Sequence, residues 1–187
     1  MLGLPIGLVY ANAMEWVIHK YMLHGRGRDK KSFWAFHWHD HHQTVRKNAM
    51  FDDAYNESLF VWGPQTKEVV ALIGGALVHA PLLPVAPFFV TGVWLSAANY
   101  YRVHRKAHLN PVWAKEHLPW HVDHHMGPNQ HANWCVSFPL WDYVMGTREK
   151  YLGTEKQRDD LAREQARATQ PATTSSEPPL SVVPQAA

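Results

Sequence analysis

Histidines recur at short spacings in four separate parts of this sequence. The 187 residues include 14 histidines, and ten of them fall in pairs or triplets. Neutral imidazole is a ligand for iron, zinc, copper and nickel, and one ion with about four to six coordination positions cannot use ten rings. The sequence therefore predicts a binuclear metal site. The four groups are His19 and His24; His37, His41 and His42; His104 and His108; and His121, His124 and His125.

The two groups in the second half of the chain have spacings that suit an α-helix. His104 and His108 are four residues apart, or about 40° around a helix, so both rings can face one ion. By the same geometry, His121, His124 and His125 fall within a stripe of about 100°. We therefore expect each group to present its rings on one face of a helix.

The group in the middle of the first half combines two spacings. His37 and His41 are four residues apart and share a helical face, with His42 offset by one residue. His39 would point roughly the opposite way in a helix. We therefore expect the rings of His37 and His41 to face the same way and treat His39 as the doubtful member.

The first group has a spacing that a regular α-helix does not favour. His19 and His24 are five residues apart, or about 140° around a helix, which is too wide for easy chelation of one ion. The two rings either serve two ions or flank a local distortion of the helix. Two metal ions suit this spacing better than one.

Several further residues are candidates that the spacing does not assign. Histidines that bind metal usually need a hydrogen-bond partner on the second ring nitrogen, and five carboxylates lie nearby in the sequence. His79, in an apolar stretch, either packs or contacts a substrate. His117 and His131 either support the site or lie at the surface. The carboxylates are Glu15, Asp40, Asp52, Asp53 and Asp123.

The composition excludes several classes of site and partner. Lysine and arginine total 18 against 16 for aspartate and glutamate, so the formal net charge is +2 and no strong field draws the chain to nucleic acid. Cys135 is the only cysteine, which excludes an intramolecular disulfide, a cysteine-rich zinc site and a cysteine-ligated iron–sulfur cluster. The nine tryptophans suit a membrane–water interface as well as a large core.

The strongest membrane signal is an uncharged, mostly apolar stretch. No Asp, Glu, Lys or Arg occurs from Val69 to Tyr101. Pro81, Pro84 and Pro87 lie in its middle, where they would break a continuous helix, so we expect two helical arms joined by a turn. Each arm is short beside the roughly 20 apolar residues that span a bilayer, so the hairpin requires tilt, local thinning or incomplete penetration.

The N-terminal stretch and the basic residues predict a topology. Residues 1–25 carry no charge until Glu15 and are expected to form another helix whose apolar part enters the lipid. They lack the basic start of a signal peptide, so we expect them to be retained. Lysines and arginines precede and follow the hairpin, and the positive-inside rule then puts all four histidine groups on the cytoplasmic side. The predicted fold is all-α: an integral, multi-pass membrane protein whose helical cap on the cytosolic face carries a histidine-rich di-metal site.

The chain divides into two parts by composition. Residues 1–152 are expected to form the membrane catalytic domain. From residue 153 onward, the sequence TEKQRDDLAREQAR suits a polar surface helix, and ATQPATTSSEPPLSVVPQAA is typical of a disordered tail. We expect no chemistry from residues 153–187.

The order of the four groups resembles the histidine boxes of the fatty acid hydroxylase/sterol desaturase superfamily. The motifs are H-x4-H from His19, H-x3-HH from His37, H-x3-H from His104 and H-x2-HH from His121. The stretch NWCVSFPLWDYVMGT is similar to the closing stretch of that family, and the resemblance covers roughly residues 8 to 150. His39 interrupts the second box and is the alternative to His37 as its first ligand. HKYMLHG and CVSF are also similar to bacterial β-carotene hydroxylases.

The resemblance implies an integral membrane enzyme that hydroxylates or desaturates a lipid, such as a fatty acyl chain or sterol, with O2. Two iron ions are the implied cofactor, zinc is an ion that purified protein can carry, and the ten grouped histidines are the implied ligands. No nucleotide motif, flavin signature or haem domain is visible, so we expect a separate reductase, ferredoxin or cytochrome as electron donor. A carotenoid oxygenase of the β-carotene hydroxylase type is the alternative within this class.

Two other functions would use histidines without O2. A non-redox zinc-binding membrane protein would have flexible histidine tracts or histidines along a membrane path, whereas these groups keep ligand spacing on the polar side. A zinc hydrolase needs fewer histidines and one open ion with a general base. The sequence favours the oxygenase and leaves the lipid, the oxidised carbon and the oligomeric state open.

Overall fold

The computed structural model describes residues 2–169, and all regular structure in that range is helical. The all-α prediction is therefore confirmed for these residues. The α-helices are α1 (Gly3–Ile18), α2 (His42–Lys47), α3 (Pro64–His79), α4 (Pro87–Leu109), α5 (Pro111–His117), α6 (Pro119–Met126), α7 (Leu140–Val144) and α8 (Glu155–Thr169). The short π-helical or 3₁₀ segments are η1 (His19–Gly25), η2 (Arg26–Arg28), η3 (Phe36–His41), η4 (Asp53–Asn56) and η5 (Ala80–Leu82).

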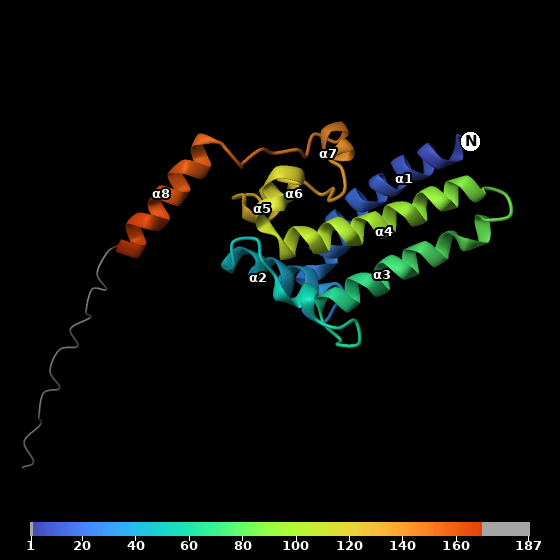
Figure 1. The fold of residues 1–187 in the computed structure, drawn as a ribbon, viewed down its shortest axis with the longest axis horizontal. Helices are drawn as coiled ribbons and strands as arrows, with labels where there is room; N and C mark the ends of the chain where they lie inside the picture. The colour runs from blue at the N-terminus through green and yellow to red at the C-terminus, as the bar shows by residue number, and fades with distance from the viewer. Residues whose placement is uncertain (1, 170–187) are drawn as a thin grey trace, which may run out of the picture.

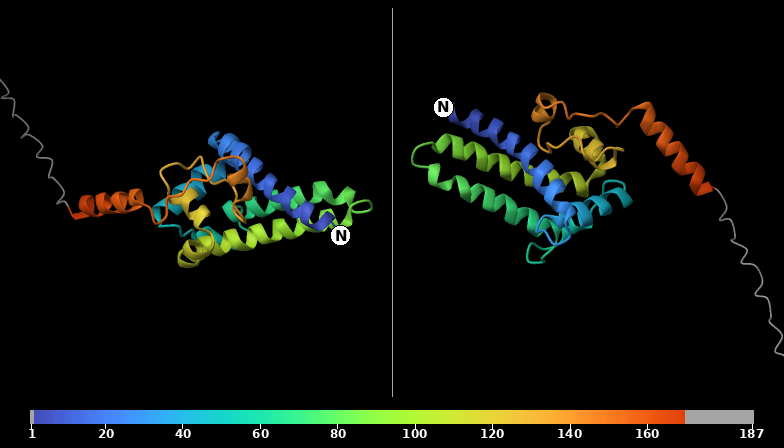
Figure 2. Two further views of the ribbon diagram at one scale, coloured as in Figure 1. Left: turned by 90° about the horizontal axis from the view of Figure 1, so that it is seen from above. Right: turned by 180° about the vertical axis from the view of Figure 1, so that it is seen from behind.

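Helices α1, α3 and α4 lie side by side and form the long layer of the molecule (Figures 1 and 2). The backbones of α1 and α4 touch at two glycines. A Cβ atom on Gly92 would lie 2.6 Å from the carbonyl oxygen of Leu4, and one on Gly7 would lie 2.3 Å from that of Phe89. Because glycine alone lacks a Cβ atom, these two positions allow α1 and α4 to pack this closely.

Helices α3 and α4 form the predicted helical hairpin. A turn that contains η5 joins His79 to Pro87, at the end of the layer where the N-terminus also lies (Figure 1). Pro87 lies in the first turn of α4, where its missing N–H is not needed. Within residues 2–169, no helix combines the length and the apolar character needed to cross a membrane. The membrane crossing and the multi-pass topology therefore stay predictions.

The opposite end of the layer carries the short helices (Figure 1). An apolar core there joins α2, α4 and α6, and its buried members include Val45, Val103, Ala107 and Val122. Because these three helices also carry grouped histidines, the core determines how the histidines meet.

Helix α8 extends away from the rest of the molecule (Figure 1). It occurs where the polar surface helix is predicted. The disordered tail predicted from residue 168 falls almost wholly on residues 170–187, which lie outside the described residues.

Candidate metal centre

The ten grouped histidines meet at one end of the layer, in a region closed to solvent. Each of them is at most 2% exposed. They form two clusters, in each of which one ring nitrogen per residue lies within 4.8 Å of the others. The first cluster consists of His19, His24, His37, His42 and His124. The second cluster consists of His41, His104, His108 and His125, and His121 borders it.

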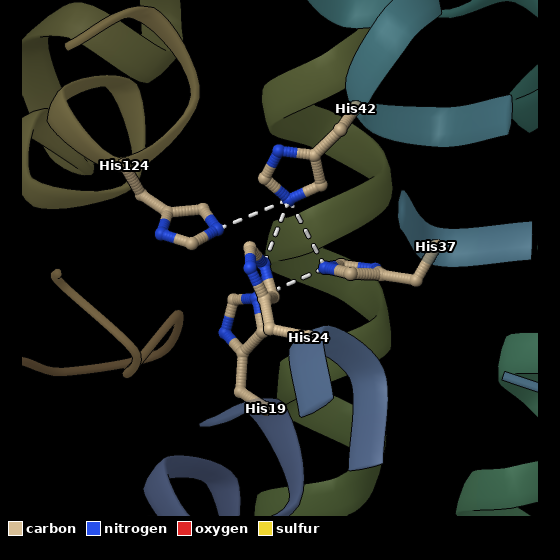
Figure 3. Close-up of side chains that lie close together, drawn as sticks. All are labelled: His19, His24, His37, His42 and His124. Carbon is tan, nitrogen blue, oxygen red and sulfur yellow. Dashed lines mark hydrogen bonds between the residues drawn. The ribbon is translucent and has the colours of Figure 1, made fainter. Parts of the chain in front are cut away.

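In the first cluster, one ring nitrogen faces more neighbouring nitrogens than hydrogen bonding can satisfy (Figure 3). His42 Nε2 lies 3.1 Å from each of three other Nε2 atoms, which belong to His24, His37 and His124. His19 Nε2 lies 3.0 Å from His37 Nε2. A neutral imidazole nitrogen carries either one proton or one lone pair, so it makes one hydrogen bond at most. A cation shared by bare Nε2 atoms would account for the crowding at His42.

The ring nitrogens of the second cluster are also crowded, and some of them lack a hydrogen-bond partner. His108 Nε2 lies 3.2 Å from His104 Nε2 and 3.0 Å from His121 Nε2. The buried Nε2 atoms of His41 and His125 have no hydrogen-bond partner among the described residues. Burial of a polar atom without a partner is unfavourable, so these atoms also indicate a bound cation.

The distances between ring nitrogens fit metal coordination in both clusters. A bond from zinc to a histidine nitrogen is about 2.1 Å long, so nitrogens 3.0–3.2 Å apart subtend roughly 90–100° at a shared ion of this size. Such angles suit a five- or six-coordinate ion, and an all-imidazole donor set suits iron or zinc. The residues present therefore fit metal ions.

The two clusters adjoin and share two segments of chain. The ring centroids of His42, in the first cluster, and His125, in the second, are 4.3 Å apart. Residues 37–42 contribute histidines to both clusters, and so does α6. This arrangement is the one that a binuclear centre requires.

A π-helical turn explains how His19 and His24 reach one cluster. Hydrogen bonds in a π-helix run between residues five apart, which stacks such residues on one side, and η1 covers both histidines. Their ring centroids are 5.0 Å apart. The structure shows the local distortion, and it places both rings in the first cluster.

A second π-helical turn divides the next histidine group. Around η3, His37 and His42 are five residues apart and belong to the first cluster, whereas His41 belongs to the second. His37 and His41 therefore fall in different clusters, although α-helical periodicity would put them on one face. His39 Nε2 lies 2.9 Å from the carbonyl oxygen of Arg28, so His37 and not His39 is the cluster member.

Regular α-helices carry the other two groups. His104 and His108 lie on successive turns of α4 and belong to one cluster, as their spacing predicts. In α6, His121 and His125 face the second cluster and His124 faces the first. The stripe on α6 therefore lies between the two clusters.

Buried carboxylates hold two rings of the second cluster by their Nδ1 atoms. His41 Nδ1 lies 2.8 Å from Asp52 Oδ2, and His104 Nδ1 lies 2.8 Å from Glu68 Oε2. The hydroxyl of Tyr55 donates to the same oxygen of Glu68 at 2.6 Å. A proton held on Nδ1 leaves Nε2 bare, which is the form that binds metal.

Backbone carbonyls hold three further rings in the same way. Each accepts a hydrogen bond from a histidine Nδ1, which again leaves Nε2 bare. The carbonyls are Met50 for His108 at 3.0 Å, Ala132 for His124 at 2.7 Å and Trp134 for His19 at 2.5 Å.

Two residues beside these carbonyls have left-handed backbone. Met50 has a φ of 87°, and Asn133, which lies between Ala132 and Trp134, has a φ of 58°. Such angles are uncommon for residues other than glycine and cluster at functional sites. In this protein, the left-handed backbone at Met50 and Asn133 accompanies carbonyl oxygens that point toward the clustered histidines.

Asp142 ties together the closing stretch NWCVSFPLWDYVMGT, which includes α7. Oδ1 of Asp142 accepts from the backbone N–H of Trp134 at 2.7 Å and from the hydroxyl of Thr147 at 2.8 Å. Thr147 also accepts the indole N–H of Trp16 on α1 at 2.9 Å. Because the carbonyl of Trp134 holds His19, this network fixes the orientation of that ring.

Burial favours the neutral form of buried imidazoles. Loss of hydration is the largest cause of the shift at His124 and lowers the pKa of that ring to about 3. Neutral rings are the form that binds metal. Burial also lowers the pKa well below its ordinary value for His19, His37, His42, His108, His121 and His125.

The other predicted carboxylates make different contacts. Glu15 accepts hydrogen bonds from backbone N–H groups of the closing stretch and thereby joins α1 to it. Asp123 pairs with Arg148 at 2.7 Å. Asp53 accepts from a nearby asparagine, and Asp40 is exposed. Of the five candidates, Asp52 is therefore the one that holds a ring of the clusters.

The isolated histidines lie outside both clusters. His117 is exposed and stacks on Trp113, with ring centroids 4.8 Å apart. His131 is exposed and stacks on Trp38. His79 lies at the hairpin turn, at the far end of the layer.

Sequence reasoning missed Glu68 and Tyr55. Glu68 is the last charged residue before the uncharged stretch that begins at Val69. A buried carboxylate at the start of an apolar helix is a signal for a functional role. Tyr55 carried no comparable signal.

An apolar cavity of about 330 Å³ lies between α1, α3 and α4 and reaches the first cluster. His19, His37 and Glu68 line it at the metal end. Apolar side chains such as Leu72 and Val93 line its middle. Its volume is within the usual range for sites that bind small molecules.

A family model described as fatty acid hydroxylase matches residues 4–147. The chain belongs to the fatty acid hydroxylase family. The matched range contains all ten histidines and the closing stretch, so the resemblance seen in the sequence is confirmed. Membership of the fatty acid hydroxylase family implies an oxidoreductase. Searches of curated proteins and of solved structures gave no match.

Proposed function

We propose that this protein is an O2-dependent oxygenase that hydroxylates a lipid, with one iron ion in each histidine cluster. The observation that carries the proposal is the apolar cavity that ends at His19 and His37 of the first cluster. An apolar chain in this cavity brings its carbon–hydrogen bonds to the metal end. Desaturation starts with the same hydrogen abstraction and differs only in the step that follows.

The protein contributes position and protection, and the metal contributes the redox chemistry. Two bound iron ions supply the oxygen activation that side-chain acid–base chemistry lacks. The carboxylates of Asp52 and Glu68 hold the protons of His41 and His104 on Nδ1, which strengthens both rings as ligands. The closed, buried surroundings exclude water from the reacting carbon.

We propose that the end of the layer remote from the clusters lies in a membrane. Large apolar side chains are exposed there on all three long helices, and Val78 and Val85 are 75% and 80% exposed. Contiguous exposed apolar surface marks a membrane or partner interface. Basic residues lie near the metal end, which supports a cytoplasmic position for the clusters. The exposed set includes Leu2, Ile6, Val9, Ile73, Leu77, Val78, Val85, Phe88 and Leu95.

We also propose that a separate protein supplies the electrons for hydroxylation. Hydroxylation consumes two electrons and two protons as R–H and O2 become R–OH and water. An aromatic stack offers a route from the surface, because His24 contacts both Trp38 and His131 at centroid distances of 5.0 and 5.6 Å. Arg28 donates to His131 at 2.5 Å on the exposed side of this stack.

The charge around the stack supports an acidic donor, such as a ferredoxin or a cytochrome. Residues 26–31 contain four basic side chains and one acidic one, and all five are exposed. Complementary charge steers association and orients the partner. We therefore propose that the donor docks over residues 26–31.

The test uses full-length protein purified without O2, whose metal content is measured before the protein is loaded with ferrous iron. The protein is reduced with dithionite and exposed once to ¹⁸O2 with a lipid extract of the expression host. About two iron ions per chain and ¹⁸O in a lipid alcohol support the proposal. Stoichiometric zinc with turnover that is independent of O2 would overturn it in favour of a zinc protein.

A matched pair of variants ties the product to the clusters. His124→Ala removes a ring of the first cluster and is expected to abolish the labelled product. His117→Ala removes an exposed ring outside the clusters and is expected to retain it. Near-normal product formation by His124→Ala would contradict the metal-ligand role of that residue.

A further inference from the structure

Tyr10 and His79 form a polar pair at the far end of the apolar cavity. The Tyr10 hydroxyl lies 3.1 Å from His79 Nε2, and both residues line the cavity. Their rings meet edge to face, with centroids 5.5 Å apart, and both pack on Phe89. The pair joins α1 to the end of α3, where exposed apolar side chains surround it.

The hydrogen bonds of His79 determine what this pair offers to a ligand. Nδ1 lies 2.7 Å from the carbonyl oxygen of Gly75, which can only accept, so Nδ1 carries the proton. Nε2 of the neutral ring is then bare and accepts the hydroxyl proton of Tyr10. The phenolic oxygen of Tyr10 keeps lone pairs and no free proton. The pair therefore offers an acceptor and requires a donor from its ligand.

The charges along the cavity exclude an acidic ligand group at this end. Among the described residues that line the cavity, none is a lysine or an arginine. A carboxylate at Tyr10 would face lone pairs without a cation, which is unfavourable in an apolar environment. A hydrocarbon end would leave the acceptor unpaired. A hydroxyl group satisfies it.

Two helices give the same distance from this pair to the metal end. Tyr10 and His19 are nine residues apart on α1 and the turn that follows it, or about 14 Å at the helical rise. Glu68 and His79 are eleven residues apart on α3, or about 16 Å. A ligand held at both ends therefore has its polar group on the order of 15 Å from the reacting carbon.

We propose that Tyr10 and His79 form a subsite for the hydroxyl group of a lipid alcohol and so set which carbon reaches the metal end. The reaction at the metal end rests on the proposed function, whereas binding of the alcohol does not. The substrate class is a long, otherwise apolar molecule that carries a hydroxyl on the end remote from the carbon that is oxidised.

The test measures binding and needs neither O2 nor an electron donor. Tritium-labelled hexadecanol binds to the zinc-loaded, full-length protein in detergent micelles, and hexadecyl methyl ether, hexadecane and palmitic acid compete with it. One hydrogen bond corresponds to roughly a 5- to 10-fold difference in affinity. We expect the alcohol to bind about 5- to 10-fold more tightly than the ether or the alkane, and more tightly than the acid.

Variants separate recognition from a purely structural role of the pair. The double variant Tyr10→Phe with His79→Leu removes both polar groups and is expected to bind the alcohol, ether and alkane equally. Tyr143→Phe deletes an exposed hydroxyl on α7 and is expected to keep the preference. The melting temperature is measured alongside for each variant.

Three results would overturn the proposal. The first is wild-type protein that shows no preference for the alcohol, a measurement that does not depend on the folding of any variant. The second is a preference that survives in the double variant. The third is an equal loss of affinity for all ligands with a lower melting temperature, which would make the pair a structural contact. Loss of ¹⁸O incorporation with intact alcohol preference would instead count against the proposed oxygenase.

Discussion

Asp52 and His41 share a hydrogen bond of 2.8 Å in which both side chains are almost fully buried. Asp52 also accepts the backbone N–H of Ala54, so one carboxylate holds a ring of the second cluster and begins η4. The contact links the metal centre to the chain that follows α2.

We expect Asp52→Asn to weaken metal binding at the second cluster by about 10- to 100-fold. The amide keeps one oxygen for Ala54 but removes the charge that favours a proton on His41 Nδ1. Metal titration of the variant, with Asp53→Asn as the control at an exposed neighbour, measures the effect. Wild-type affinity in Asp52→Asn would show that Asp52 has no influence on the metal.

The contact between α1 and α4 predicts opposite outcomes for two glycines. Gly92→Ala puts a Cβ atom 2.6 Å from a carbonyl of α1, so we expect a loss of about 1–3 kcal/mol in the free energy of unfolding. Gly74→Ala has no atom within 4 Å of its new Cβ, so the helix propensity of alanine is expected to add up to about 1 kcal/mol.

Chemical denaturation of both alanine variants checks this prediction. Both substitutions put alanine in place of a glycine within a helix, so the effect of alanine on helix propensity is common to the two variants. The difference in their free energies of unfolding therefore reports the contact at Gly92. Equal stability of the two variants would show that α1 and α4 do not touch at Gly92.

The buried imidazoles predict that the metal-free protein is sensitive to acid. The folded-state pKa of His124 is about 3, below its ordinary value of 6.5, so the unfolded chain takes up the proton first as the pH falls. Stability is therefore greatest above about pH 6.5 and decreases from there towards about pH 3.

Urea unfolding of the metal-free protein across that range measures the effect. A midpoint that stays constant between about pH 6.5 and about pH 4 would mean that the rings are hydrated in the folded protein. The same series with metal bound is expected to start from a higher midpoint, because metal binds the folded chain.

Reversal of charge at Arg28 is expected to slow reduction by an acidic protein donor and to leave reduction by dithionite unchanged. Arg28 lies beside Trp38 and His131 on the surface proposed for the donor. Stopped-flow reduction of iron-loaded Arg28→Glu by a ferredoxin at low salt is expected to be about 10-fold slower than for wild type.

The matched control for this charge reversal is Arg158→Glu on α8, which is exposed and lies outside the stack. High salt is expected to remove most of the difference, since screening weakens steering. If Arg28→Glu reacted with ferredoxin at the wild-type rate, the donor would dock elsewhere.

The sequence predicted the histidine clusters because local spacing carries much of that information. His104 and His108 follow α-helical periodicity, and the structure brings them together. His37 and His41 have the same spacing but belong to different clusters, because a π-helical turn changes which residues share a side and apolar periodicity does not reveal that turn. The prolines of the hairpin likewise predicted two arms, which the structure contains.

The hydrogen-bond partners of the rings were less predictable. Asp52 lies only eleven residues after His41, and proximity made it a candidate. Glu68 meets His104 across 36 positions of sequence, and no local pattern encodes that contact. The carbonyl of Met50 depends on a left-handed backbone, which side-chain identity alone did not indicate.

Under the proposed function, the sharing of residues 37–42 and α6 between the two clusters would link the binding of one ion to that of the other. An ion in the first cluster would order the segments that carry His41 and His125, so the second ion would meet ligands already in position. Chains in a metal-poor cell should therefore be either empty or doubly loaded, and few should hold a single ion. The shared segments would thereby keep half-loaded centres scarce.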